Sequence, residues 1–177
     1  MLGTRKQRLI AGGAIATAGV TAALLNPIGA AQAGHDNAVL ETSLRGEKEV
    51  PMSGNPNRNV GDPNGRGKAF VFGIDNDPNT LCYVLRVNKI APATMAHIHK
   101  GRRNENGPVV VNLAAPDDGN AGDCLTQGEP GKFEDGQTVQ EILEHPRRFY
   151  VNVHNERFPG GAIRGQLEYE RPPGGQN

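Results

Sequence analysis

Two stretches of the chain have the period-two alternation of a β-strand. In the first, residues 95–101, His97 and His99 share one strand face and Ile98 points to the opposite face. In the second, residues 149–154, one face is apolar and the other is polar. The apolar face contains Phe149, Val151 and Val153, and the polar face contains Tyr150, Asn152 and His154. We therefore predict two strands, each with one face in a core and one polar face in water.

Short alternating segments bounded by turn residues continue through most of the remaining chain. With 24 Gly, 13 Pro and no Trp, the composition favours a turn-rich β protein over a helical one. Further strands are predicted at 38–44, 68–74, 81–88, 108–113 and 162–168. The pairs 68–74 with 81–88, and 148–154 with 162–168, are predicted hairpins, and the stretches 51–67 and 114–136 are predicted loops.

One segment has the pattern of a helix. Thr138 and Glu141 are spaced as in a capping box, in which the first side chain caps the helix and the second lies in its first turn. An apolar stripe follows, formed by Val139, Ile142 and Leu143. Pro146 ends the pattern, so we predict one short helix at about 138–145.

The first 33 residues are typical of a secretory signal peptide. Arg5, Lys6 and Arg8 precede an apolar run, and Ala31-Gln32-Ala33 resembles a cleavage site. A membrane anchor is the alternative, but the apolar run is short for a span and ends at Asn26-Pro27. We expect a secreted, extracellular or cell-envelope protein, with a domain at 34–170, a disordered tail at 171–177 and no membrane span after cleavage.

Charge argues against a nucleic-acid partner. Cleavage after Ala33 leaves 16 basic side chains against 19 acidic ones, a formal charge of −3. A nucleic-acid-binding domain carries a basic surface, which this composition does not predict.

Two cysteines remain after cleavage, Cys82 and Cys124. An exported protein enters an oxidising compartment, which favours a disulfide bond. Metal ligation is the alternative, but two distant cysteines without a C-x-x-C motif are a weak metal signature. A bond that closes a loop of about forty residues stabilises by roughly 3–4 kcal/mol in the chain-entropy model.

The histidines are the candidate ligand residues. Imidazole is the commonest metal ligand in proteins, and His97, His99 and His154 together would hold Cu or Zn with an open position. Tyr150 and Asn152 share the face of His154 and would orient the rings. Binding is expected to weaken as the pH falls through about 6.5. The alternative is that the histidines are ordinary residues of a solvated sheet face, and only the tertiary structure decides whether the two strands are neighbours.

Several blocks of the chain, in order, resemble the CHRD domain, the repeat first named from chordin. They are LRGEKEVP at 44–51, AHIHKG at 96–101, NGPVVV at 106–111, YVNVHN at 150–155 and FPGGAIRGQL at 158–167. The helix and the two cysteines are similar to those of bacterial single-domain secreted members. The resemblance covers about residues 39–168 and implies an all-β fold, an immunoglobulin-like or Greek-key antiparallel β-sandwich with one short helix.

The resemblance implies no catalytic activity, and we identify no G-x-S-x-G motif, phosphate loop or acid–base pair in the sequence. We therefore expect a monomeric, non-catalytic binding module whose partner is an extracellular protein, a surface polymer or a metal ion. The alternative is a Cu/Zn redox protein, because a His-x-His strand also occurs in the Greek-key sandwich of Cu/Zn superoxide dismutase. A shared sandwich does not by itself carry function.

Overall fold

The computed structural model describes residues 38–52 and 60–170. All of them belong to one unit of the chain, Ala33–Asn177. The predicted signal peptide at 1–33 and the predicted tail at 171–177 lie outside the described residues. No helix within the described part of the chain is both long enough and apolar enough to cross a membrane.

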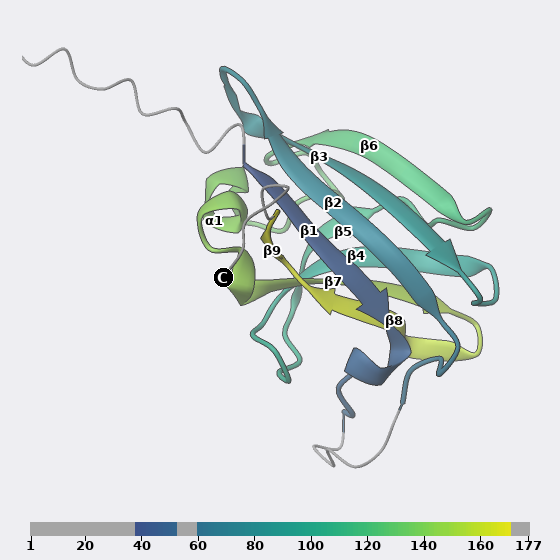
Figure 1. Cartoon of the computed structure of the whole chain (residues 1–177). Helices are drawn as coiled ribbons and strands as arrows, with labels where there is room; N and C mark the ends of the chain where they lie inside the picture. The colour runs from purple at the N-terminus through teal and green to yellow at the C-terminus, as the bar shows by residue number, and fades with distance from the viewer. Residues whose placement is uncertain (1–37, 53–59, 171–177) are drawn as a thin grey trace, which may run out of the picture. The chain divides into compact units, whose positions relative to one another are not determined.

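The described residues form an antiparallel sheet of nine strands (Figure 1). The strands are β1 (Val39–Arg45), β2 (Arg66–Ile74), β3 (Asp77–Asn88), β4 (Ala93–Lys100), β5 (Val109–Leu113), β6 (Asn120–Thr126), β7 (Phe149–Asn155), β8 (Phe158–Gln166) and β9 (Glu168–Tyr169). Their order in the sheet is β5-β4-β7-β8-β1-β2-β3-β6, and β9 pairs with β1. The predicted all-β antiparallel fold and both predicted hairpins, β2–β3 and β7–β8, are confirmed.

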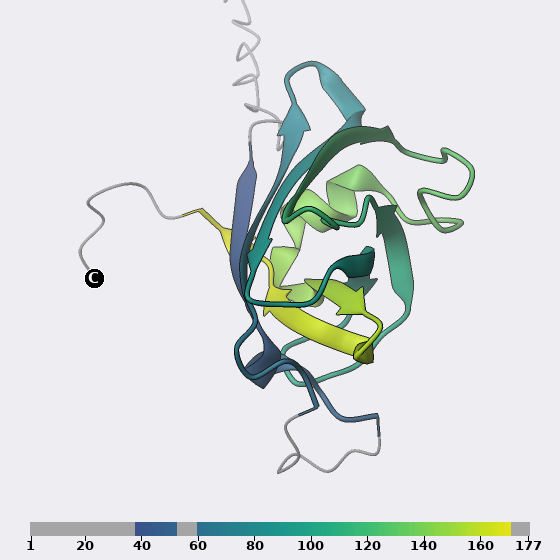
Figure 2. The same cartoon turned by 90° about the vertical axis from the view of Figure 1, so that its right-hand side faces the viewer.

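The sheet has two halves that meet along a narrow seam. β5, β4, β7 and β8 form one half, and β1, β2, β3 and β6 form the other. Between the halves, β1 and β8 share the residue pair Arg45–Arg164. Figure 2 shows that the halves curl toward each other into a nearly closed barrel. The structure thus differs from a sandwich of two separate sheets, because the twist of the strands curls one hydrogen-bonded sheet around the core.

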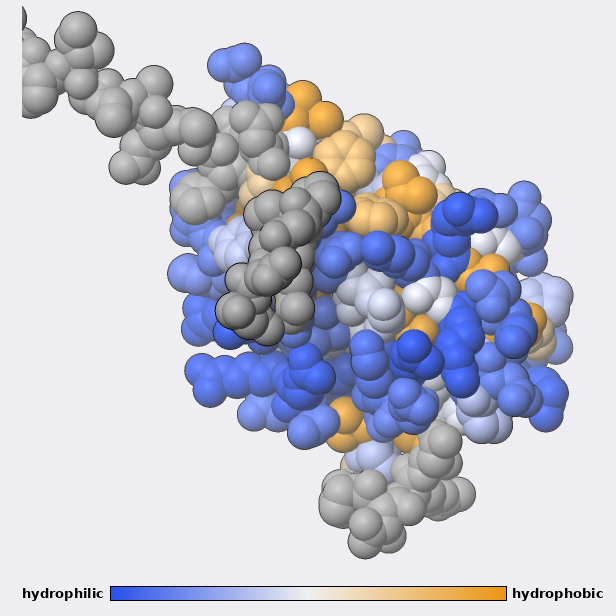
Figure 3. Space-filling view, in the orientation of Figure 1, coloured by the Kyte–Doolittle hydropathy of each residue, from blue (hydrophilic) through white to orange (hydrophobic). Residues whose placement is uncertain are grey.

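Apolar side chains from both halves fill the space between them. Five apolar strand-region residues are fully buried in one cluster: Ile98, Val151 and Val153, which the alternation predicts, and Ile163 and Leu167. Figure 3 shows hydrophilic residues over most of the face drawn there, with an apolar band over strands β2 and β3. Ile74 and Val84, which are exposed apolar residues, belong to these two strands.

The predicted helix is confirmed as α1 (Val139–Glu144). The Thr138 hydroxyl accepts a hydrogen bond from the Glu141 backbone N–H, as the capping pattern predicts. The Glu141 side chain instead forms an ion pair with Lys100 of β4, which ties the helix to the sheet. Two 3₁₀ turns, η2 (Gly46–Lys48) and η3 (Pro146–Arg148), complete the described helical segments.

The predicted loop at 114–136 is wrong in part, because it contains strand β6. Most residues of β6 are exposed and only Leu125 is buried, so the strand lacks the apolar alternation that marks the others. β6 pairs with β3 and places Cys124 directly opposite Cys82. The predicted disulfide is confirmed, with the two Cα atoms 4.0 Å apart.

Val153 provides a test of the assigned strand faces. The side chain is fully buried in the core, so Val153→Ala should lower the free energy of unfolding by about 1–3 kcal/mol through lost burial and a cavity. Val84→Ala is the matched control, because Val84 is 41% exposed and should change stability by less than about 0.5 kcal/mol. Urea unfolding measures both variants, and equal effects would contradict the assignment.

Candidate metal site

Strands β4 and β7 are neighbours in the sheet, which the sequence left open. Their antiparallel register places His97 opposite Asn152, His99 opposite Tyr150, and Met95 opposite His154. Residues that face each other in this way project from the same side of a sheet. The structure therefore brings His97, His99 and His154 to one face, as predicted.

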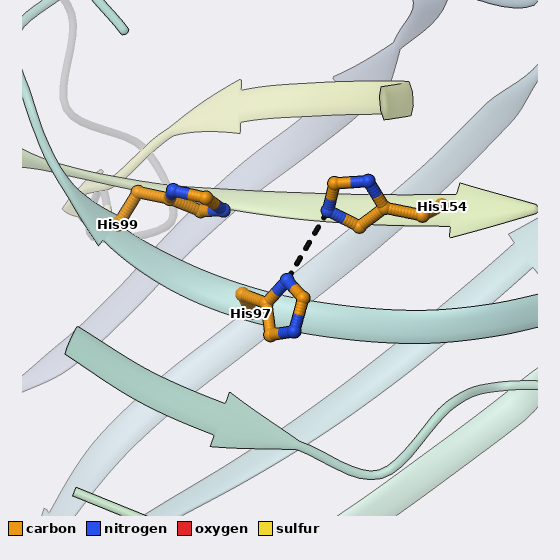
Figure 4. A group of neighbouring side chains, drawn as sticks. All are labelled: His97, His99 and His154. Carbon is orange, nitrogen blue, oxygen red and sulfur yellow. Dashed lines mark hydrogen bonds between the residues drawn. The ribbon is translucent and has the colours of Figure 1, made fainter. Parts of the chain in front are cut away.

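The three imidazoles converge (Figure 4). Their ligand nitrogens all lie within 4.8 Å of one another, and His97 Nδ1 is 3.2 Å from His154 Nε2. Within residues 38–52 and 60–170, no other group of at least three His, Cys, Asp or Glu side chains has a spacing suited to a metal ion.

Backbone carbonyls set the tautomers of two of these rings. His99 Nδ1 lies 3.0 Å from the Gly107 carbonyl oxygen, and His154 Nδ1 lies 3.0 Å from that of Pro159. A carbonyl oxygen only accepts, so both Nδ1 atoms carry the proton and each Nε2 bears a lone pair. The His154 Nε2 lone pair accepts a hydrogen bond from His97 Nδ1. His99 Nε2 is buried and has no hydrogen-bond partner within the described residues.

Burial keeps the three rings uncharged. Together with smaller contributions from charge repulsion by His154 and His99, it lowers the pKa of His97 to about 4. The pKa values of His99 and His154 are also lowered, in each case mainly by burial. Hydrogen bonds to Gly107 and Pro159 partly oppose this, but all three rings remain in the neutral form that binds metals.

Tyr150 orients His99 in two ways. The two rings stack, with centroids 4.7 Å apart and an interplanar angle of 6°. The Tyr150 hydroxyl also accepts a hydrogen bond from the Gly107 N–H, so it holds the residue whose carbonyl binds His99. Tyr150 therefore lies where it can orient His99, and this role stays a prediction.

Arg164 holds the loop that contains Gly107. Its guanidinium lies 3.4 Å from the centroid of the Tyr150 ring. It donates hydrogen bonds to the carbonyl oxygens of Arg102 and Glu105 and to the side chain of Asn106. The loop at 101–107 is thereby tied to β8, beside the sheet face that bears the histidines.

The polar face of β7 is buried, which corrects the prediction that it meets water. Tyr150, Asn152 and His154 are each less than 10% exposed. Glu49, which follows η2, also lies on this face and forms a hydrogen bond with the Asn152 side chain. Asn152 therefore contacts a buried acid, and its role in orienting a histidine ring stays a prediction.

Glu49 and Arg164 are the two site residues that sequence reasoning missed. Both occur in blocks that resemble the CHRD domain, which is the one sequence signal that marks them. Neither has a local pattern that predicts burial, yet Glu49 is 8% exposed and Arg164 is 2% exposed. Burial raises the pKa of Glu49 to about 8, although the positive charge of Arg164 and the contact with Asn152 oppose the shift.

The raised pKa of Glu49 predicts a stability that falls as the pH rises. The folded protein keeps this proton up to about pH 8, whereas the unfolded chain loses it near 4.5, so raising the pH favours unfolding. The buried histidines work in the opposite direction near pH 6.5, where the unfolded chain loses their protons, but they do so equally in Glu49→Gln, which lacks the acid. Relative to Glu49→Gln, wild type should therefore lose about 2 kcal/mol of unfolding free energy between pH 6.5 and 8. Parallel stability curves from urea unfolding would contradict the assignment.

A comparison with protein-family models matches residues 40–167 to the CHRD domain. The match confirms the resemblance drawn from the sequence blocks and covers nearly the whole described part of the chain. No curated protein matches the chain. The histidines, Glu49 and Arg164 all lie within the matched residues. The chain belongs to the CHRD domain family.

Proposed function

We propose that this chain binds a copper or zinc ion through His97, His99 and His154, in an oxidising compartment outside the cytoplasm. The observation that carries the proposal is the arrangement of protons on the rings. Two carbonyls hold the protons of His99 and His154 on Nδ1, so each Nε2 bears a lone pair that a metal can bind. His97 now donates from Nδ1 to His154 Nε2, and it frees both nitrogens for the metal when its proton moves to its own Nε2.

The distances between the histidine nitrogens support a copper or zinc ion. Two nitrogens bound tetrahedrally at 2.0–2.1 Å lie about 3.3 Å apart. His97 Nδ1 and His154 Nε2 are hydrogen-bonded at 3.2 Å, so a metal could replace the shared proton with almost no change in their separation. The widest spacing in the group is 4.8 Å, so closing the site requires a ring movement of roughly 1–1.5 Å.

The donor types support copper or zinc over magnesium or calcium. Imidazole nitrogen suits Zn and Cu, whereas Mg and Ca prefer oxygen ligands. The proposed site contains three nitrogens and no carboxylate. His99 Nε2, buried without a partner among the described residues, is satisfied once it coordinates a metal.

Export supports the proposed compartment. The Cys82–Cys124 disulfide suggests an oxidising environment, and the first 33 residues have the pattern of a secretory signal peptide. Mass spectrometry of secreted material should find an N-terminus at Gly34.

Direct titration tests the metal site. Purified metal-free protein should bind one Cu²⁺ or Zn²⁺ ion, and the double variant His97→Ala/His99→Ala should bind more than about 100-fold more weakly, because loss of even an orienting neighbour costs 10–100-fold. His145→Ala is the control, since His145 lies outside the histidine group, at the C-terminus of α1. Calorimetry measures all three proteins, and equal affinity in wild type and the double variant would refute the proposal.

Metal binding should persist below the pH expected from an ordinary histidine. Protons compete with the metal only near the pKa of the free ligand, and these pKa values lie below 6.5, at about 4 for His97. The loss of affinity should therefore be centred below pH 6.5, and competition by a proton on His97 should begin only as the pH approaches about 4. A tenfold loss centred near pH 6.5 would contradict the lowered pKa values.

A redox enzyme is the second candidate. Three protein ligands leave a position open on the metal, as catalytic sites do, and His97 and His99 are only partly buried. The test is an assay of superoxide loss by the copper-loaded protein, with the double variant His97→Ala/His99→Ala as the negative control. Activity that depends on the two histidines would favour the enzyme, and metal binding without activity would favour a binding module.

A further inference from the structure

Met95 lies on the same strand as His97 and His99, and packing in the core does not explain why an apolar side chain occupies this position. It precedes His97 by two residues in β4 and faces His154 across the β4–β7 pair. The side chain is 45% exposed, so it contributes little to the buried core. Cβ atoms of residues paired in this way lie about 4.5–5.5 Å apart, so the side chains of Met95 and His154 project from neighbouring positions on the same face.

The backbone is irregular at this point on both sides of β7. The β4–β7 register shifts between Ala93 and Met95, and the β7–β8 register shifts between Val153 and Asn155. Shifts of this kind occur next to functional sites, where they redirect a side chain. Met95 and His154 both lie at these shifts.

We propose that Met95 supplies its thioether sulfur as a fourth ligand, so that the site prefers Cu(I) to Zn(II). The inference rests on the proposed metal site. Thioether sulfur is a soft donor that selects Cu(I), whereas imidazole alone serves copper and zinc alike. The three rotatable bonds of methionine allow the sulfur to reach a metal held by the neighbouring histidines.

The test compares two metals in three proteins. Met95→Leu keeps the size of the side chain and removes the sulfur donor. Met52→Leu is the matched control, because Met52 is also exposed, at 91%, and lies outside the strands. Cu(I) affinity is measured by competition with a chromophoric chelator in the absence of oxygen, with ascorbate as reductant, and Zn(II) affinity is measured by calorimetry.

Met95→Leu should weaken Cu(I) binding by about tenfold or more and leave Zn(II) binding within about twofold. Met52→Leu should match wild type for both metals. Equal Cu(I) affinity in Met95→Leu and wild type, or an equal loss for both metals, would overturn the assignment of Met95. Wild type that binds neither metal would instead refute the metal site itself, so the two failures are distinguishable.

X-ray absorption gives an independent readout. Copper in the reduced wild-type protein should show one sulfur neighbour, which Met52→Leu keeps and Met95→Leu loses. Both cysteines of the chain form the disulfide, so a sulfur signal that disappears in Met95→Leu comes from the methionine. A sulfur signal that persists in Met95→Leu would contradict the proposal.

Discussion

The antiparallel pairing of β4 with β7 is the interaction on which the rest of the structure depends. It places Ile98 beside Val151 in the core and, on the opposite face, gathers the three histidines. A slip of one residue would move every side chain of one strand to the other face. The buried apolar residues therefore fix the register, and the register in turn positions the candidate ligands.

A buried polar layer covers the histidine-bearing face. Arg164 ties the 101–107 loop to the sheet and lies against Tyr150, which stacks on His99. Burial of Glu49 and Arg164 is costly, and such groups usually persist where they position something. Here the polar contacts hold the Gly107 carbonyl, which orients His99 and fixes its proton.

The same burial determines the chemistry of the site. Removal from water lowers the pKa of each of the three imidazoles, so they stay neutral at pH values where exposed histidine is protonated. Three neutral imidazoles whose ligand nitrogens lie within 4.8 Å of one another suit a metal cation. A buried acid on the same face, Glu49, remains protonated near neutral pH and adds no negative charge there.

The sequence by itself determined the local structure and the two faces of each strand. Period-two alternation predicted that Ile98 and Val153 enter the core and that His97 and His99 share the opposite face, and the capping pattern predicted α1. These features depend on residues close together in the chain, so they can be read from spacing alone. The family resemblance predicted the antiparallel β fold. It also implied a sandwich of two sheets, whereas the structure has one curled sheet.

Only the tertiary structure decided which strands are neighbours and what covers them. The approach of His154 to His97 joins residues 57 positions apart, and no periodicity encodes that contact. Strand β6 was missed because its mostly exposed residues carry no apolar alternation. Burial of the polar face of β7 depends on Glu49, Arg164 and the 101–107 loop, which fold back from distant parts of the chain. Long-range packing determines these contacts, and local spacing does not record it.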